Sequence, residues 1–243
     1  MITPKDLTII YYTANYLDTE NPFFLKNTKA QLVKAIGDLP LIVVSQKPTE
    51  RFEGYKGEYR NICVGNIGRS HLNIYKQILI GTKEAKTPYV AMAEDDILYS
   101  YEHFHTKLPV DNMFLYDMNR LSIFTWTKPP LYSYRHNRKV VNQLIAPTKM
   151  LIEAMEERFA KYPDLSKVPL KYWGDPGRYE NHLGVTVRAT YTFMCTNPSI
   201  VFSHPKAYGY EFNQGKRKRL GDLRIIEIPY WGTAAQVLKF YEK

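Results

Sequence analysis

Three consecutive carboxylates, Glu94, Asp95 and Asp96, follow an apolar run that spans residues 89–93. A run of this length between turn-forming residues predicts a buried central strand. Acidic side chains at the carboxyl end of such a strand lie where α/β sheets bind their ligands. Two of these carboxylates can hold a hard divalent cation through oxygen, and the cation can in turn hold a diphosphate. The alternative is a solvated acidic turn that binds nothing.

Two more carboxylates, Asp175 and Glu180, stand in an aromatic and glycine-rich stretch at residues 172–180. Either can act as a general base towards a hydroxyl group. Asp-Pro-Gly is also a good turn signal, so Asp175 is equally well explained as a turn residue. No turn role explains Glu180.

A histidine, His204, comes directly after an apolar run at residues 199–203. An imidazole can join carboxylates around Mn²⁺. A lone histidine is more often a core or surface residue, and His182 is a competing candidate for the same role.

The chain of 243 residues carries a formal net charge of +9, which favours a polyanionic partner: nucleic acid, a phosphorylated small molecule or an anionic membrane face. Lys216 and Arg217 begin a basic run, residues 216–219, that glycines flank. This run has three interpretations: a loop over a bound diphosphate, a clamp on a phosphate backbone, or a solvated surface loop. Residues 132–139 interleave aromatic and basic side chains but match no named nucleic-acid-binding motif.

Periodicity in the first half predicts the elements that position these residues. Strands are expected at residues 6–13, 40–45, 61–64 and 89–93, and helices at residues 22–36 and from Ser70 to about Lys86. Strands that alternate with helices predict a mostly parallel sheet covered by helices. No internal repeat, low-complexity tract or linker divides the chain, so we expect a single domain.

The second half is less regular. Two short strands joined by a turn are predicted at residues 112–116 and 121–126, and a helix capped by Thr148 at residues 148–162. Further strands are predicted at residues 191–195, 199–203 and 223–228, before a short amphipathic stretch at the C-terminus.

The two cysteines, Cys63 and Cys195, form no CxxC motif, and each lies in an apolar, strand-like run. We expect buried free thiols in a reducing compartment. Residues 1–30 lack a signal-peptide pattern, and no apolar run is long enough to span a bilayer. These features predict a cytoplasmic protein.

Three stretches together resemble the nucleotide-binding half of a GT-A glycosyltransferase. They are the first strand ending at residues 11–13, the block Gly65-Asn-Ile-Gly-Arg-Ser70, and the strand that leads into the three carboxylates. The resemblance covers roughly residues 6–104, with weaker similarity to about residue 205. It implies that residues 1–104 form the nucleotide-sugar-binding half of the domain and residues 105–243 the acceptor-binding half. The acidic triplet resembles the family's DxD motif only as Glu-x-Asp.

The resemblance implies a mixed, mostly parallel sheet and a metal-dependent transfer of a sugar from a nucleotide-diphosphate donor, with a UDP-sugar as the first guess. Its site residues would be Asp96 and Glu94 as ligands of Mn²⁺ or Mg²⁺, with His204 completing the set. Asp95 would face the sugar or ribose, Tyr11 and Thr13 the base, and Arg69 the ribose or phosphate, while Asp175 or Glu180 would serve as the base. The positive charge makes DNA with a hydroxylated base a candidate acceptor; a glycan or lipid-linked acceptor, or binding of nucleic acid without catalysis, are the alternatives.

Overall fold

The computed structural model describes residues 2–110, 112–134, 139–164, 167, 175–204, 221 and 223–242. The first half of the chain alternates strands and helices as predicted. Its elements are β1 (Leu7–Thr13), α1 (Leu17–Glu20), α2 (Pro22–Ile36), β2 (Leu41–Ser45), β3 (Tyr59–Cys63), α3 (His71–Glu84) and β4 (Tyr89–Ala93). Asn21 caps α2 by accepting a hydrogen bond from the Phe24 N–H group, and Gly37 ends this helix in a positive-φ conformation.

The second half contributes shorter elements. They are β5 (Ile97–Leu98), α4 (Tyr101–His105), β6 (Met113–Asp117), β7 (Arg120–Phe124), β8 (Tyr132–Tyr134), η1 (Val141–Gln143), β9 (Leu144–Pro147), α5 (Thr148–Lys161), α7 (Glu180–Leu183), β10 (Ala189–Phe193), β11 (Ser199–Ser203), β12 (Leu223–Ile225), β13 (Glu227–Ile228), β14 (Gly232–Thr233) and α9 (Ala234–Leu238).

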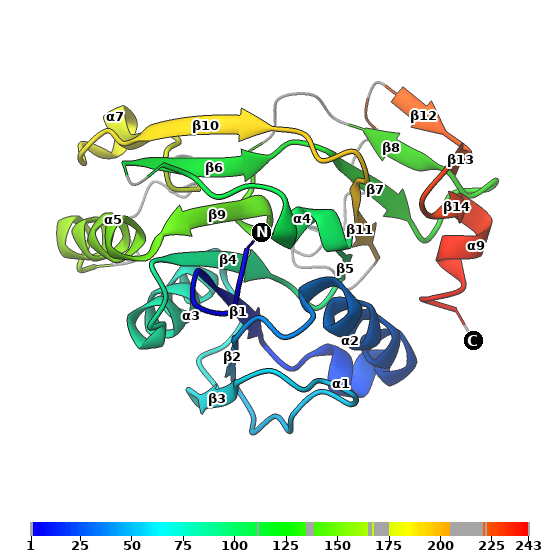
Figure 1. Cartoon of the computed structure of the whole chain (residues 1–243), viewed down its shortest axis with the longest axis horizontal. Helices are drawn as coiled ribbons and strands as arrows, with labels where there is room; N and C mark the ends of the chain where they lie inside the picture. The colour runs from blue at the N-terminus through cyan, green and yellow to red at the C-terminus, as the bar shows by residue number, and fades with distance from the viewer. Residues whose placement is uncertain are drawn as a thin grey trace.

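The described strands form a seven-stranded sheet in the order β10-β6-β9-β4-β1-β2-β3. Neighbouring strands are parallel except at β9, which is antiparallel to both β4 and β6. Figure 1 shows these strands running through the middle of the molecule with helices beside them. The mixed, mostly parallel sheet flanked by helices confirms the predicted fold class.

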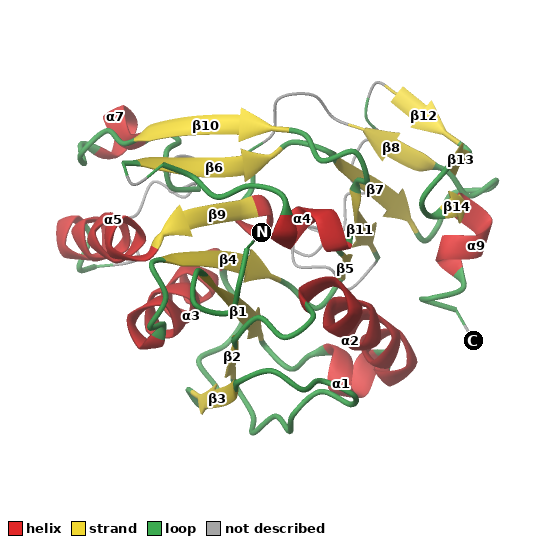
Figure 2. Ribbon diagram, in the orientation of Figure 1, coloured by secondary structure: helices red, strands yellow, loops and turns green. Residues whose placement is uncertain are grey.

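Helices cover both faces of this sheet (Figure 2). On one face, the apolar side chains of α3 and α5 pack against those of β1, β2 and β4 in one core cluster. On the other face, α2 and α4 bury their apolar side chains in a second cluster. Alternate residues of β1 point into the two clusters, with Ile10 and Tyr12 in the first and Ile9 and Tyr11 in the second.

A second sheet of five described strands has the order β12-β8-β7-β11-β5, and a third core cluster lies between it and α1, α2 and α9. The chain passes from the large sheet to this sheet at the three carboxylates, because β4 ends at Ala93 and β5 begins at Ile97. The acidic turn therefore joins two sheets.

The two short strands predicted at residues 112–116 and 121–126 are present as β6 and β7, which follow each other along the chain but lie in different sheets. Two other local predictions are wrong. Thr148 is not a cap but the first helical residue of α5, and its hydroxyl donates to the Thr87 carbonyl. The strand expected at residues 223–228 is split between β12 and β13, which pair with different partners.

The two cysteines are both free thiols, but only one of them is buried as predicted. Cys63 is exposed because it ends β3, the edge strand of the large sheet. Cys195 is buried, and burial together with the nearby Asp117 carboxylate raises the pKa of its thiol. In the described part of the chain, no helix combines the length and apolar character that crossing a membrane requires.

Candidate active site

The register of β1 against β4 places the acidic triplet. These parallel strands pair Tyr11 with Ala93, so the next two residues of each strand face each other at the carboxyl edge of the sheet. The Tyr12 hydroxyl donates to Glu94 Oε1 at 2.6 Å, and the Thr13 hydroxyl donates to Asp95 Oδ2 at 2.6 Å. The first strand thus holds two of the three carboxylates through its own side chains.

Glu94 is held from the other side by the segment before β9. Antiparallel pairing of β9 with β4 brings η1 to the carboxyl end of β4. From there the Asn142 amide donates to Glu94 Oε2 at 2.8 Å, and the Tyr99 hydroxyl accepts from the Glu94 N–H group at 3.2 Å while donating to the Asn142 carbonyl. Both oxygens of Glu94 are therefore oriented by hydrogen bonds.

The second sheet brings His204 to the same place. Strand β11 runs antiparallel to β5, and the Phe202 N–H group donates to the Asp96 carbonyl at 2.9 Å. His204 follows β11 directly, is 3% exposed, and packs its ring against Phe24 and Tyr241. A pairing of two strands that are more than 100 residues apart in sequence thus puts the histidine beside the acidic turn.

The opposite wall is the loop that leads into α3. Gly65 and Gly68 adopt positive φ angles that side chains rarely tolerate, and Ser70 caps α3 by accepting from the Asn73 N–H group at 3.0 Å. The Arg69 guanidinium lies over the Tyr16 ring at 4.0 Å from its centroid. This wall presents a cation and the N-terminus of a fourteen-residue helix, an arrangement that favours anions.

These walls enclose one cavity of about 120 Å³. Most of the site residues predicted from the sequence line it: Thr13, Arg69, Glu94, Asp95, Asp96 and His204. Further residues that the sequence did not single out also line it: Tyr12, Tyr16, Leu17, Gln46, Asn73 and Gln77.

The cavity concentrates negative charge on its acidic side. Burial raises the pKa of Glu94, although the hydrogen bonds from Tyr12 and Asn142 act in the opposite direction. Burial also raises the pKa of Asp95 to about 6, against the stabilising bond from Thr13. Burial lowers the pKa of Lys29 of α2, while the negative charge of Asp95 acts in the opposite direction. For Glu94 and Asp95, the loss of hydration on burial therefore outweighs the hydrogen bonds that the protein donates to them.

Oxygen ligands with one imidazole suit Mg²⁺ or Mn²⁺, so the residue types present fit such an ion. A carboxylate oxygen can still coordinate an ion while accepting one hydrogen bond, because it has two lone pairs. The ligand atoms of Glu94, Asp96 and His204 are not preassembled, however. Among the described residues, the group of three or more ligand-type side chains whose atoms all lie within 4.8 Å of one another is a different one, His103, Asp117 and Cys195.

Tyr11, predicted to contact the base, does not line this cavity. Its side chain is 1% exposed and packs edge-on against Phe52, with 5.1 Å between ring centroids, on the opposite face of the sheet. Burial raises the pKa of its phenol, with a further contribution from Asp95. The side chain that reaches the cavity is that of Tyr12, since successive residues of a strand point to opposite faces.

The two candidate bases lie outside the cavity lining. Asp175 accepts a hydrogen bond from the Val141 N–H group at 2.5 Å and lies 3.6 Å from Arg178 in an ion pair. Glu180 is 4% exposed and accepts from Arg158 Nη2 at 2.8 Å, and its carboxylate also accepts from the Gly177 N–H group. The charge of Asp175 contributes to the raised pKa of Glu94, after the larger effect of burial.

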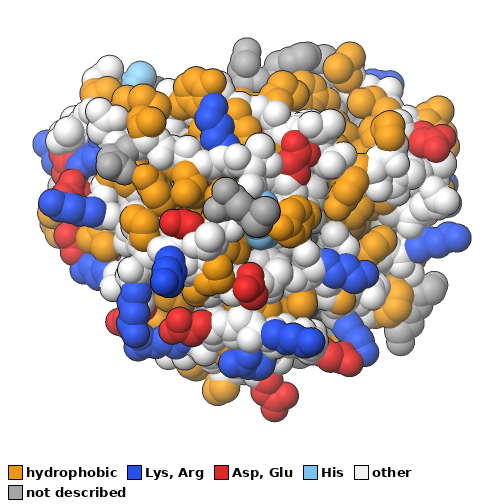
Figure 3. Space-filling view, in the orientation of Figure 1, with side chains coloured by type: hydrophobic (Ala, Val, Ile, Leu, Met, Phe, Trp, Pro, Cys, Tyr) orange, Lys and Arg blue, Asp and Glu red, His pale blue; other side chains and the backbone are white. Residues whose placement is uncertain are grey.

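Lys216 and Arg217 lie outside the described residues. The face shown in Figure 3 mixes Lys and Arg side chains with Asp and Glu side chains, so the described residues on that face form no continuous basic surface.

The site includes residues that only long-range pairing could reveal. Gln77 of α3 donates to the carbonyls of Thr13 and Val44, both at 2.9 Å, and so ties the helix to the ends of β1 and β2. Asn15, at φ 56°, accepts from the N–H groups of Gln46 and Lys47. The Ala14-Asn15 turn after β1 was the available sequence signal, whereas nothing local marked Gln77 or Asn142.

No protein-family model and no curated protein matches the chain. Solved structures with a similar arrangement include the apo form of the glycosyltransferase GlyE from Streptococcus pneumoniae, with 10% identity and a TM-score of 0.45 over 76% of this chain and 45% of that one. An active-site mutant of LgtC shares 12% identity with a TM-score of 0.45 over 88% and 80% of the two chains. A nucleotidyl transferase from Methanothermobacter thermautotroptrophicus shares 12% identity with a TM-score of 0.41 over 79% and 88%.

The chain thus spans less than half the length of GlyE. At these identities and TM-scores, the likenesses identify neither a substrate nor a reaction for this chain.

Proposed function

We propose that the chain is a metal-dependent glycosyltransferase that moves a sugar from a nucleotide-diphosphate donor, with a UDP-sugar as the first candidate, to an acceptor hydroxyl. The observation that carries the proposal is the cavity itself. It joins three carboxylates and a histidine on one wall to Arg69 and the N-terminus of α3 on the other. A diphosphate with its divalent cation has the charge distribution that these two walls complement.

The cavity volume of about 120 Å³ is small compared with the roughly 300–1,000 Å³ of pockets that enclose whole drug-sized ligands. We therefore assign to it the diphosphate and the ion, with the remainder of the donor extending out of its open side. Asp96, Glu94 and His204 would hold Mg²⁺ or Mn²⁺. When bound, that ion would neutralise the charge that develops on the leaving diphosphate.

The chain's own residues would do the positioning. Tyr12 and Asn142 fix the orientation of Glu94, and Thr13 fixes that of Asp95, so that Asp95 can face the sugar or ribose. Arg69 would contact the ribose or a phosphate from the opposite wall. Thr13 and Tyr12, rather than Tyr11, are the β1 residues available to the donor.

As the base that accepts the proton of the acceptor hydroxyl, we retain Asp175. Glu180 is assigned to the fold instead, because its carboxylate compensates the charge of the fully buried Arg158. Lys216 and Arg217 remain proposed contacts of the donor diphosphate.

For the acceptor, DNA that carries a hydroxylated base is the substrate to test first, supported by the net charge of +9. Its binding should weaken steeply as salt rises, because counterions are released from the phosphate backbone. Binding that does not respond to salt, or no binding at all, favours a glycan or lipid-linked acceptor. The cytoplasmic location inferred from the sequence likewise remains a prediction.

The class of reaction can be tested without knowing the acceptor. The full chain is incubated with a panel of UDP-sugars and Mn²⁺ but no acceptor. The UDP set free by slow transfer of the sugar to water is measured with and without chelator. We expect release that depends on the metal and is lost in Asp96→Asn, while the exposed Asp38→Asn serves as a matched control with full activity.

Two outcomes contradict the proposal. Consumption of a nucleoside triphosphate with a sugar phosphate, giving pyrophosphate, would identify a nucleotidyl transferase. Retention of DNA with no affinity for any nucleotide would identify a non-catalytic nucleic-acid-binding protein.

A further inference from the structure

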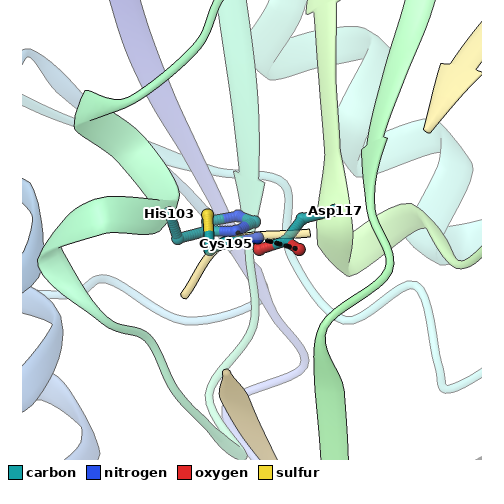
Figure 4. A group of neighbouring side chains, drawn as sticks. All are labelled: His103, Asp117 and Cys195. Carbon is teal, nitrogen blue, oxygen red and sulfur yellow. Dashed lines mark hydrogen bonds and ion pairs between the residues drawn. The ribbon is translucent and has the colours of Figure 1, made fainter. Parts of the chain in front are cut away.

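A second group of chemically reactive side chains lies away from the cavity, where His103, Asp117 and Cys195 meet (Figure 4). They come from three elements: α4, the end of β6, and the segment that follows β10. One ring nitrogen, one carboxylate oxygen and the sulfur all lie within 4.8 Å of one another. Tertiary packing, not local sequence, assembles this group, since up to 92 residues separate its members.

The group is fully enclosed. His103, Asp117 and Cys195 are 0%, 1% and 2% exposed. His103 Nδ1 lies 3.0 Å from Asp117 Oδ2, while Asp117 Oδ1 accepts from the N–H groups of Asn119 at 2.9 Å and of Cys195 at 3.2 Å. Backbone donors thus fix the carboxylate in place, as outer hydrogen bonds commonly fix a metal ligand.

The hydrogen bonds among the three side chains do not satisfy every polar atom of the group. His103 Nε2 is buried and has no hydrogen-bond partner in the described part of the chain. A buried imidazole nitrogen without a hydrogen-bond partner from the protein is uncommon in protein interiors. The imidazole therefore has bonding capacity that the contact with Asp117 does not use.

We propose that His103, Asp117 and Cys195 bind a divalent transition-metal ion, with Zn²⁺ as the preferred ion. Nitrogen and thiolate ligands select zinc over Mg²⁺ and Mn²⁺, which prefer oxygen. On binding, the Cys195 thiol releases its proton to solvent as the sulfur–zinc bond forms. A thiolate, a carboxylate and a neutral imidazole around a 2+ ion sum to zero charge, which suits a site from which water is excluded.

The ion would tie together α4, β6 and the segment between β10 and β11, where His103 packs against Tyr99 with 5.2 Å between ring centroids. Tyr99 in turn holds the Glu94 backbone. The ion would stabilise this support without touching the donor, so its chemistry is separate from that of the Mg²⁺ or Mn²⁺ proposed above.

The test is the metal content of the full chain, purified without chelator, together with a zinc titration. We expect about one Zn²⁺ per chain, at least a tenfold loss of affinity in Cys195→Ser and Asp117→Asn, and no change in Cys63→Ser, the matched cysteine control. Asp96→Asn should keep its zinc, because that residue belongs to the other site. Zinc content that is unaffected by Cys195→Ser would overturn the proposal.

A second measurement does not depend on whether a buried-site variant folds. In Cys63→Ser, Cys195 is the sole remaining cysteine. Adding Co²⁺ to this variant should produce a sulfur-to-cobalt charge-transfer absorption, which Zn²⁺ then abolishes by displacement. The absence of that absorption in folded protein would show that the group is a hydrogen-bonded cluster only.

Discussion

Replacing Glu180 by Gln tests whether this residue supports the fold or acts as the catalytic base. In the structure, Arg158 and Glu180 form an ion pair with 0% and 4% of their side chains exposed. Arg158 Nε is also buried without a hydrogen-bond partner in the described part of the chain, so the guanidinium depends on Glu180 for compensation of its charge. The substitution keeps the side-chain volume and removes the charge.

Breaking a buried ion pair by removing one partner costs roughly 3–5 kcal/mol. A Gln oxygen can still accept from Arg158 and from the Gly177 N–H group, so we expect the lower end, about 3 kcal/mol. For a chain of this size each kcal/mol lowers Tm by about 2–4 °C, which gives a decrease of about 6–12 °C.

The assay is thermal and urea unfolding of the full chain, read alongside UDP release per folded molecule. Glu84→Gln is the matched control, because Glu84 pairs with Arg60 on the surface, where the two side chains are 41% and 55% exposed. That control should lose less than about 1 kcal/mol. A Tm of Glu180→Gln within 1 °C or so of the wild type, with turnover lost, would refute the structural assignment and restore Glu180 as the base.

Three further substitutions test the site and its support. Tyr12→Phe removes the hydroxyl group that donates a hydrogen bond to Glu94 at 2.6 Å. Because a hydrogen bond to a charged group contributes about 1.5–3 kcal/mol, the metal-dependent affinity for the nucleotide-sugar, measured by calorimetry, should fall about tenfold or more. Unchanged affinity would contradict this role. Tyr11→Phe, one residue away, should leave the affinity for the nucleotide-sugar unchanged and the Tm equal or higher. The reason is that the buried Tyr11 hydroxyl has no hydrogen-bond partner in the described part of the chain. Weakened binding would show that Tyr11 contacts the nucleotide-sugar after all. Gly81→Ala should lower the free energy of unfolding in urea, because the added Cβ would lie 2.7 Å from Ile10 Cγ2 and 2.9 Å from Val44 Cγ2. Overpacking costs about 1–3 kcal/mol, which outweighs the gain of about 1 kcal/mol in helix propensity. A more stable variant would show that α3 can move away from the sheet.

The sequence predicts best where local pattern and burial agree. β1, α2, β2, α3 and β4 all carry apolar residues with a clear period between turn residues, and the acidic triplet, Thr13, Arg69 and His204 were all found to line one cavity. For His204 the signal was its position after an apolar strand. The pairing of β11 with β5, which brings it there, has no local sequence signature.

The predictions that were wrong depend on strand pairing and tertiary packing, which the local sequence does not show. Tyr11 and Tyr12 are the same residue type in adjacent positions, and only the register and the packing of Phe52 decide which one reaches the cavity. The apolar run around Cys63 predicts a buried thiol, but β3 is an edge strand and leaves this side chain exposed. The group of His103, Asp117 and Cys195 could not be predicted, since its members meet only through tertiary packing.

The central claim is that the acidic wall of the cavity binds the metal–diphosphate part of a nucleotide donor. Its most direct test is calorimetric titration of UDP into the chain with Mn²⁺, with chelator, and in the Asp96→Asn variant. The proposal predicts binding with Mn²⁺ that falls at least tenfold in chelator and in the variant, while Asp38→Asn binds as the wild type does. Equal affinity for UDP in all four titrations, or none in any, would contradict it.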